Sequence, residues 1–456
     1  MLSRLNHQAA DEGITLIEVL VAMMVFAIIA VGVAYGLITA LYLGNDARSR
    51  ETATNLAAQE IDLARATSDV FAVVDNDKTV VQNGTTFRLQ RVTSWITTTN
   101  PDGICGSGGG QLRYKRVNVT VTWDSMRAST RPVRADSALA PGTKLNDPAF
   151  GTILVSVLTA AGTGASGVAV SAVPASIPNG AATLTVAPVA TDAQGCSYVL
   201  KVKPGNYAVS IARSNYLDRG QSATPATTVS VMAGGAASVS FSYDLAQTIT
   251  ANYAPGFLAG TLLIPSNLDT TFRSSYGLYT PGAVTNATSV AFRLHPFGAG
   301  YEVFAGKYVA ASSTSAGCLS VDPAEWITPA ADGAIGSPAP RVGTVPGGAA
   351  SVNMRMGVVM VSGLSGKYLR AVSQTGAATT GDPGCAVAAS YTFGLLPAGL
   401  QAQIALPFGS WNLYSGDTAT SQTVAVPAAQ LTVVSRGGPV AADGIVTLDP
   451  RMVVLP

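Results

Sequence analysis

Apolar residues dominate the chain from Ile14 to Leu43, and Glu18 is the only charged residue among them. A run of this length can cross a bilayer as a helix, because about 20 apolar residues span the hydrocarbon core. An unpaired charge inside such a segment costs free energy and marks a functional position. The pattern therefore predicts a membrane-spanning helix that carries one carboxylate with a role of its own.

After Gly44 the pattern becomes amphipathic, and no proline occurs from Ile14 to Thr67. We therefore expect one continuous helix over residues 14–67, which would be roughly 80 Å long at 1.5 Å per residue. Its second half presents a narrow apolar stripe at helical spacing, suited to packing on a small globular head. The stripe consists of Ala53, Leu56, Ala57, Ile61 and Ala64.

Beyond the helix, β-branched residues alternate with polar ones between Gly and Pro, which predicts short strands and turns. Residues 68–126 are predicted to form a small β-sheet head, in which residues 117–123 give one apolar and one polar face. Residues 127–148 carry three prolines and scattered charge, and we interpret them as a linker.

Residues 149–245 are predicted to form a β unit with a Pro204-Gly205 turn. Proline fixes φ, glycine permits the turn, and Tyr207 enters the core as the next strand begins. This turn and the closing strand resemble the transthyretin-like, carboxypeptidase-regulatory-type β-sandwich. The segment GGAASV at 234–239 recurs at 347–352, which predicts two further β modules, 246–357 and 358–456.

Composition argues against several classes of function. Only 12% of the 456 residues are charged and the net charge is +1, which argues against nucleic-acid binding. The chain has two histidines, His7 and His295. The sequence therefore offers no histidine-based catalytic triad and no cluster with the spacing of zinc ligands. We therefore expect neither an enzyme nor a cofactor or metal site. The predicted fold class is α+β: a long N-terminal helix with a β-sheet head, then tandem all-β sandwich modules.

All the cysteines follow the apolar run, where an even number permits two disulfides with three connectivities. We favour Cys318 with Cys385 and, second, Cys105 with Cys196. Free buried thiols are the alternative.

The start of the chain resembles a known family. Gly13 precedes the apolar run and Glu18 is the fifth residue after it. Together with residues 15–22 (TLIEVLVA) and 55–62 (NLAAQEID), this resembles type IV prepilins and type II secretion pseudopilins, most of all the minor ones. The resemblance covers about the first seventy residues. A cleaved secretory signal would have an apolar stretch of only about 7–15 residues, and a plain membrane anchor would not need Glu18.

The resemblance implies that residues 1–13 are a leader which a prepilin peptidase removes between Gly13 and Ile14. It also implies N-methylation of Ile14 and a role for Glu18 in filament assembly. Two features depart from the family pattern. Ile14 stands where Phe is frequent, and Asp11 and Glu12 make the leader less basic than usual.

These observations predict a minor pilin of a type IV pilus-like filament, at or near the tip, whose β modules serve adhesion or assembly priming. A type II secretion pseudopilin and a membrane-tethered surface binding protein are the alternatives. The expected partners are the prepilin peptidase, other pilins, the pilus assembly platform, the membrane before assembly and a surface ligand, but no nucleic acid. The protein would cross the cytoplasmic membrane once, with its C-terminal region outside, and then enter an extracellular filament.

Overall fold

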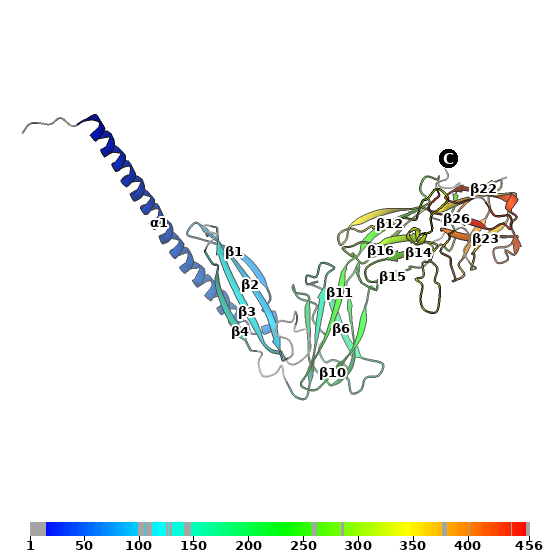
Figure 1. The fold of residues 1–456 in the computed structure, drawn as a ribbon. Helices are drawn as coiled ribbons and strands as arrows, with labels where there is room; N and C mark the ends of the chain where they lie inside the picture. Colours follow the sequence, from blue (N-terminus) through cyan, green and yellow to red (C-terminus); the bar gives the residue numbers. More distant parts are fainter. Residues whose placement is uncertain are drawn as a thin grey trace, which may run out of the picture. The chain divides into compact units, whose positions relative to one another are not determined.

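The computed structural model describes residues 15–98, 105, 112–124, 126, 130–140, 147–257, 262–283, 287–375, 381–399, 401–438 and 440–452. The chain divides into two compact units, Met1–Asn146 and Asp147–Pro456 (Figure 1). Each is described on its own.

The first unit consists of one long helix and one antiparallel sheet. Helix α1 (Leu16–Ala66) has 51 residues, about 77 Å at 1.5 Å per residue. The sheet has the strand order β1-β2-β3-β4. After α1, the elements of this unit are the short helix η1 (Val70–Ala72) and the strands β1 (Asn76–Gln82), β2 (Thr85–Thr97), β3 (Leu112–Trp123) and β4 (Val133–Leu139). In β3 the alternation predicted from the sequence is present: Val117, Val119 and Val121 are fully buried.

The interval interpreted as a linker is corrected by the structure. Strand β4 lies inside it and pairs with β3 over Val121↔Val133 to Lys115↔Leu139. The strand buries Val133 and Leu139 at its two ends. The inward positions between them carry only the small residues Ala135 and Ser137, so the sequence shows a weak apolar signal there. The head therefore extends at least to Leu139.

The second unit begins with a two-sheet sandwich. One sheet has the order β7-β5-β11-β9 and the other β10-β8-β6. Both contribute to one core, around the fully buried Tyr207 and Tyr243. The strands are β5 (Gly151–Leu158), β6 (Ala169–Pro174), β7 (Cys196–Val202), β8 (Gly205–Ala212), β9 (Tyr216–Asp218), β10 (Ala226–Val231) and β11 (Ala236–Leu245).

Four further sheets follow, in the orders β16-β12-β18, β13-β22-β19-β25, β15-β14-β17 and β21-β20-β23-β24, with β26 also on β23. Their strands are β12 (Gln247–Tyr253), β13 (Leu262–Leu263), β14 (Thr270–Arg273), β15 (Leu278–Tyr279), β16 (Ser289–Leu294), β17 (Glu302–Ala305), β18 (Ala349–Met354), β19 (Gly357–Ser362), β20 (Tyr368–Ser373), β21 (Ser390–Leu395), β22 (Gln401–Leu406), β23 (Gly409–Gly416), β24 (Val424–Ala425), β25 (Leu431–Ser435) and β26 (Val446–Leu448), with the short helices η3 (Pro323–Glu325) and η4 (Ala428–Gln430).

The predicted division near residue 357 is not present. One continuous core extends from Ile249 to Leu448, and β13 pairs with β22 across the proposed boundary. Ser266 N–H also donates to Thr392 C=O at 2.8 Å. Residues 247–452 therefore form one interlocked β region instead of two modules, because β13 of the first half completes a sheet of the second half and both halves share one core. The fold class itself is confirmed as a long N-terminal helix followed by many β-strands.

Candidate functional site

The start of the chain holds the residues that the sequence singles out. Gly13 and Ile14, the predicted cleavage and methylation positions, lie outside the described residues. Glu18 lies in the first turn of α1, where its N–H donates to Thr15 C=O at 3.0 Å. The positive end of the helix dipole favours a carboxylate in this turn. Within the described part of the chain, Glu18 forms no ion pair.

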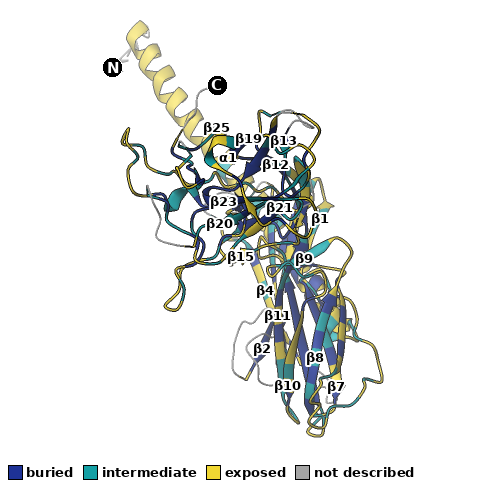
Figure 2. Cartoon of the chain, turned by 90° about the vertical axis from the view of Figure 1, so that its right-hand side faces the viewer, coloured by how far each residue is buried: buried dark blue, intermediate teal, exposed yellow. Residues whose placement is uncertain are grey.

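The first half of α1 is an apolar cylinder. Its large apolar side chains are exposed from Leu16 to Leu43, and Figure 2 shows this part of the helix as exposed. Among the described residues, α1 is the one helix whose length and composition would let it span a membrane; its most apolar window has a mean hydropathy of 2.8 and none of it is buried. Exposed apolar surface on this scale requires lipid or other helices around it.

The second half of α1 anchors the head. The predicted stripe Ala53, Leu56, Ala57, Ile61 and Ala64 is buried throughout. It shares one core with the buried face of β3, including Val117, Val119 and Val121. The expected amphipathic packing of this half is thus confirmed.

Sequence reasoning missed one buried carboxylate in the same stripe. Glu60 is 3% exposed and pairs with Arg91, whose Nη1 lies 2.9 Å from Oε1. Lys78 binds the other carboxylate oxygen. Arg91 Nε also donates to Val74 C=O at 2.8 Å. The available signal was position: Glu60 falls between Leu56 and Ala64 at four-residue spacing, on the apolar side of the helix.

The cysteines fall in both units. Cys318 and Cys385 form a disulfide that closes a separation of 67 residues, the pairing favoured from the sequence. The bond connects the two halves of the β region that share one core. The second favoured pairing, Cys105 with Cys196, would join residues of different units and stays a prediction.

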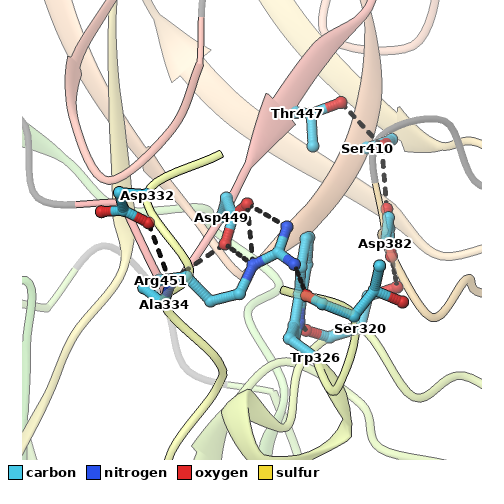
Figure 3. Close-up of polar contacts among 10 residues, drawn as sticks. Ser320, Trp326, Asp332, Ala334, Asp382, Ser410, Thr447, Asp449 and Arg451 are labelled. Atoms are coloured by element: carbon cyan, nitrogen blue, oxygen red, sulfur yellow. Dashed lines mark hydrogen bonds and ion pairs between the residues drawn. The ribbon is translucent and has the colours of Figure 1, made fainter. Parts of the chain in front are cut away.

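Buried polar side chains of the β region form a network of hydrogen bonds and ion pairs (Figure 3). Arg451 Nη2 lies 2.5 Å from Asp449 Oδ2, and its guanidinium stacks 5.1 Å from the ring centroid of Trp326. The hydrogen bonds to Asp449 raise the pKa of Arg451. Asp382 accepts hydrogen bonds from Ser320 at 2.5 Å and from Ser410 at 2.8 Å. These buried carboxylates are therefore satisfied by partners within the fold.

No group of three or more His, Cys, Asp or Glu in the described ranges could hold a metal ion. His295 is buried, and its ring Nδ1 lies 2.9 Å from Leu217 C=O. Burial lowers its pKa, so the ring is neutral at pH 7 and joins the sandwich to the rest of the β region.

Comparisons with known proteins identify the start of the chain. The family model of the prokaryotic N-terminal methylation motif matches residues 9–34. That range contains Gly13, Ile14 and Glu18 and continues into the exposed half of α1. No curated protein matches the chain.

Solved structures give only distant similarities. The Bacillus anthracis TIE protein is 9% identical, with 75% of this chain and 68% of that chain covered, at a TM-score of 0.19. A streptococcal ancillary pilin is 10% identical, with 61% and 80% covered, at 0.19. BcpA, the major pilin subunit of Bacillus cereus, is 10% identical, with 65% and 91% covered, at 0.17. Similarities this low carry no argument about fold or function.

The methylation motif implies processing by a prepilin peptidase and assembly with other pilins. The apolar half of α1 fits a membrane-anchored pilin. The chain therefore has the N-terminal methylation motif of type IV prepilins, followed by a β-rich region.

Proposed function

We propose that this protein is a minor pilin of a type IV pilus-like filament, positioned at or near the tip. The observation that carries the proposal is the methylation motif at residues 9–34, continuous with a helix that leaves every large apolar side chain from Leu16 to Leu43 exposed. Lipid covers this surface before assembly, and the helices of neighbouring pilins cover it afterwards. The β region is the exposed working part, for adhesion or for priming of assembly.

Gly13, Ile14 and Glu18 each have a role in this proposal. The peptidase cuts after Gly13 and the new N-terminus, Ile14, is methylated. Glu18 lies in the first helical turn without an ion pair among the described residues. A neighbouring subunit's amino terminus would provide its counter-ion, because a lone charge in an apolar filament core is costly.

The size of the β region supports a minor role. A regularly packed shaft repeats one subunit at short intervals, and the unit from Asp147 to Pro456 is much larger than the head. Such a unit would obstruct its own copies in the shaft. A terminal position avoids this conflict. We further propose that the protein has no enzymatic activity, since the buried carboxylates of the described β region are engaged in structural pairs.

Immunogold labelling of purified filaments tests this function. The proposal expects sparse label concentrated at filament ends. Label along the whole shaft would contradict the minor role. Absence from pili, together with presence in a type II secretion pseudopilus, would replace the proposal with the pseudopilin alternative. Retention of an uncleaved leader in the membrane would favour a tethered surface binding protein.

Two truncations separate the scaffold from the exposed part. A chain ending at Asn146 keeps β4 and the whole first unit. It should be processed and reach the filament but lose any adhesion. A matched chain ending at Arg131 removes β4 and uncovers β3, so it should fail to fold its head. If the longer truncation assembles and adhesion persists, priming becomes the better proposal.

A further inference from the structure

The β region contains a groove that the pilin function does not use. Its volume is about 690 Å³, within the range of roughly 300–1,000 Å³ that ligand sites occupy. Residues 351–355, in and just after β18, line one side, and residues 337–342 belong to the lining as well. Apolar side chains contribute, among them Phe304 and Phe408.

The backbone of β18 has a free edge. Among the described strands, β18 ends the sheet β16-β12-β18 and pairs only with β12. Thr248 N–H donates to Gly348 C=O and Ala254 N–H to Met354 C=O, both at 2.9 Å. Since the bonding direction alternates along a strand, Ser351 and Asn353 direct their N–H and C=O groups away from β12.

The groove follows this edge. Successive side chains of a strand point to opposite faces, so a cavity that touches five consecutive residues, 351–355, runs beside the strand and not over one face. The edge of β18 therefore borders the groove, which β17 lines as well.

The chain's own segment 337–342 lines the groove but does not pair with β18 among the described strands. Pro338 and Pro340 lack a backbone N–H, and proline cannot donate to a strand ladder. This segment instead pairs at its C-terminal end with the residue before β17: the backbones of Tyr301 and Val342 exchange hydrogen bonds of 2.7 and 2.8 Å. The arrangement keeps the groove open beside β18.

The lining is strongly basic. It includes four arginines and no aspartate or glutamate. Arg341 pairs with Glu302 at 3.1 Å, and Arg451 pairs with Asp449. Arg355 and Arg436 form no ion pair in the described part of the chain. They are close enough that, after burial, the charge of Arg355 lowers the pKa of Arg436. Two unneutralised guanidinium groups thus lie at one place in the groove.

We propose that this groove binds an extended, acidic peptide segment of a partner protein as a strand added to β18, with Arg355 and Arg436 pairing with its carboxylates. Main-chain hydrogen bonds to a sheet edge provide affinity in such complexes, and side-chain pockets provide specificity. Arginine suits carboxylates because its planar fork can bind them through two parallel hydrogen bonds. The free edge favours a peptide over an acidic polysaccharide, which has no backbone N–H pattern to match it. The inference does not depend on whether the chain enters a filament.

Fluorescence anisotropy on the full chain in detergent micelles tests the site. The probe is a labelled heptapeptide, Thr-Glu-Val-Glu-Val-Glu-Thr. Two matched probes carry Gln in place of Glu, or N-methyl groups on alternate backbone amides. We expect saturable binding of the acidic probe and at least tenfold weaker binding of both matched probes. Equal binding of the N-methylated probe would contradict strand addition, and lack of saturable binding by the acidic probe would overturn the proposal.

Variants locate the binding to the groove. Arg355→Gln combined with Arg436→Asn should weaken binding at least tenfold; Asn is used because Arg436 has φ 58°, which Asn tolerates. Arg293→Gln, an exposed arginine on β16 of the same sheet, should change binding less than twofold. An unchanged melting temperature verifies folding of both variants. Wild-type affinity of the double variant, or displacement by polygalacturonate at lower concentration than by unlabelled peptide, would overturn the proposal.

Discussion

The two halves of α1 belong to one continuous helix and have opposite surroundings. From Leu16 to Leu43 the large apolar side chains are exposed. From Ala53 to Ala64 the apolar stripe is buried against the sheet of the head. The first half therefore gains its burial only in a membrane or an assembly, and the second half gains it by folding. Folding stability and assembly are assigned to separate stretches of one helix.

Two glutamates of the helix, Glu18 and Glu60, sharpen this contrast. Glu60 is buried and neutralised by Arg91 and Lys78 within the fold. Glu18 is exposed and forms no ion pair among the described residues. A buried charge without a partner is strongly destabilising, whereas an exposed one costs little. The same side chain should therefore serve folding at one position and assembly at the other.

The largest effect is expected at the anchor. Glu60→Ala leaves Arg91, which is 14% exposed, without its carboxylate. Loss of one partner of a buried pair costs about 3–5 kcal/mol, so the free energy of unfolding of the first unit should fall by that amount in urea titration. Asp62→Ala is the matched control, since the Asp62 side chain is 74% exposed; it should change stability by less than about 0.5 kcal/mol. Similar values for both variants would show that Glu60 is not an anchor.

The disulfide should act on the β region alone. Replacing Cys318 and Cys385 by Ser removes a bond across 67 residues, which typically lowers stability by about 2–4 kcal/mol. The unfolding transition of the second unit should move, while that of the first unit stays in place. Urea titration followed by limited proteolysis distinguishes the two transitions. A shift in both would contradict independent folding of the two units.

Apolar truncations compare the two halves directly. Leu56→Ala removes a side chain that is 9% exposed and should cost about 2–3 kcal/mol, toward the low end for a buried leucine. Leu37→Ala removes one that is 61% exposed and should leave the stability of the head unchanged in detergent. If Leu37→Ala destabilises the head as much as Leu56→Ala, the first half of α1 has a folding role that this account lacks.

The smallest effect on stability is expected at Glu18. Glu18→Ala should be inserted and cleaved normally and unfold like the parent protein, because the carboxylate forms no ion pair among the described residues. Its incorporation into filaments, measured by quantitative immunoblotting of sheared fibres, should drop. Glu18→Asp is the companion variant and should restore part of the loss. Parental incorporation of Glu18→Ala would argue against pairing with a neighbour's amino terminus.

Local patterns predicted much of the fold. The helix, its buried stripe and strand β3 follow from periods of 3.6 and 2, which nearby residues express directly. Strand β4 was missed because its inward positions between Val133 and Leu139 carry only Ala135 and Ser137, which give little apolar signal. The predicted boundary at 357 was wrong because the pairing of β13 with β22 joins residues about 140 apart in the sequence. No local pattern indicates such contacts.

The sites divide in the same way. Gly13, Ile14 and Glu18 belong to a contiguous motif, so the sequence alone predicts them as candidates. Glu60 with Arg91 and Lys78, and Arg355 with Arg436, are brought together only by the fold. The one sequence signal for the Glu60 cluster was a carboxylate within an apolar helical stripe. No sequence signal pointed to the pair Arg355 and Arg436.

The central claim is that the chain is a processed prepilin, and the mature N-terminus tests it most directly. The protein should be isolated from cells with an active prepilin peptidase and its N-terminal peptide analysed by mass spectrometry. We predict a peptide that begins with N-methylated Ile14 in the parent protein and a retained leader in Gly13→Ala. A mature protein that begins at Met1 or Leu2 in the same cells would contradict the account.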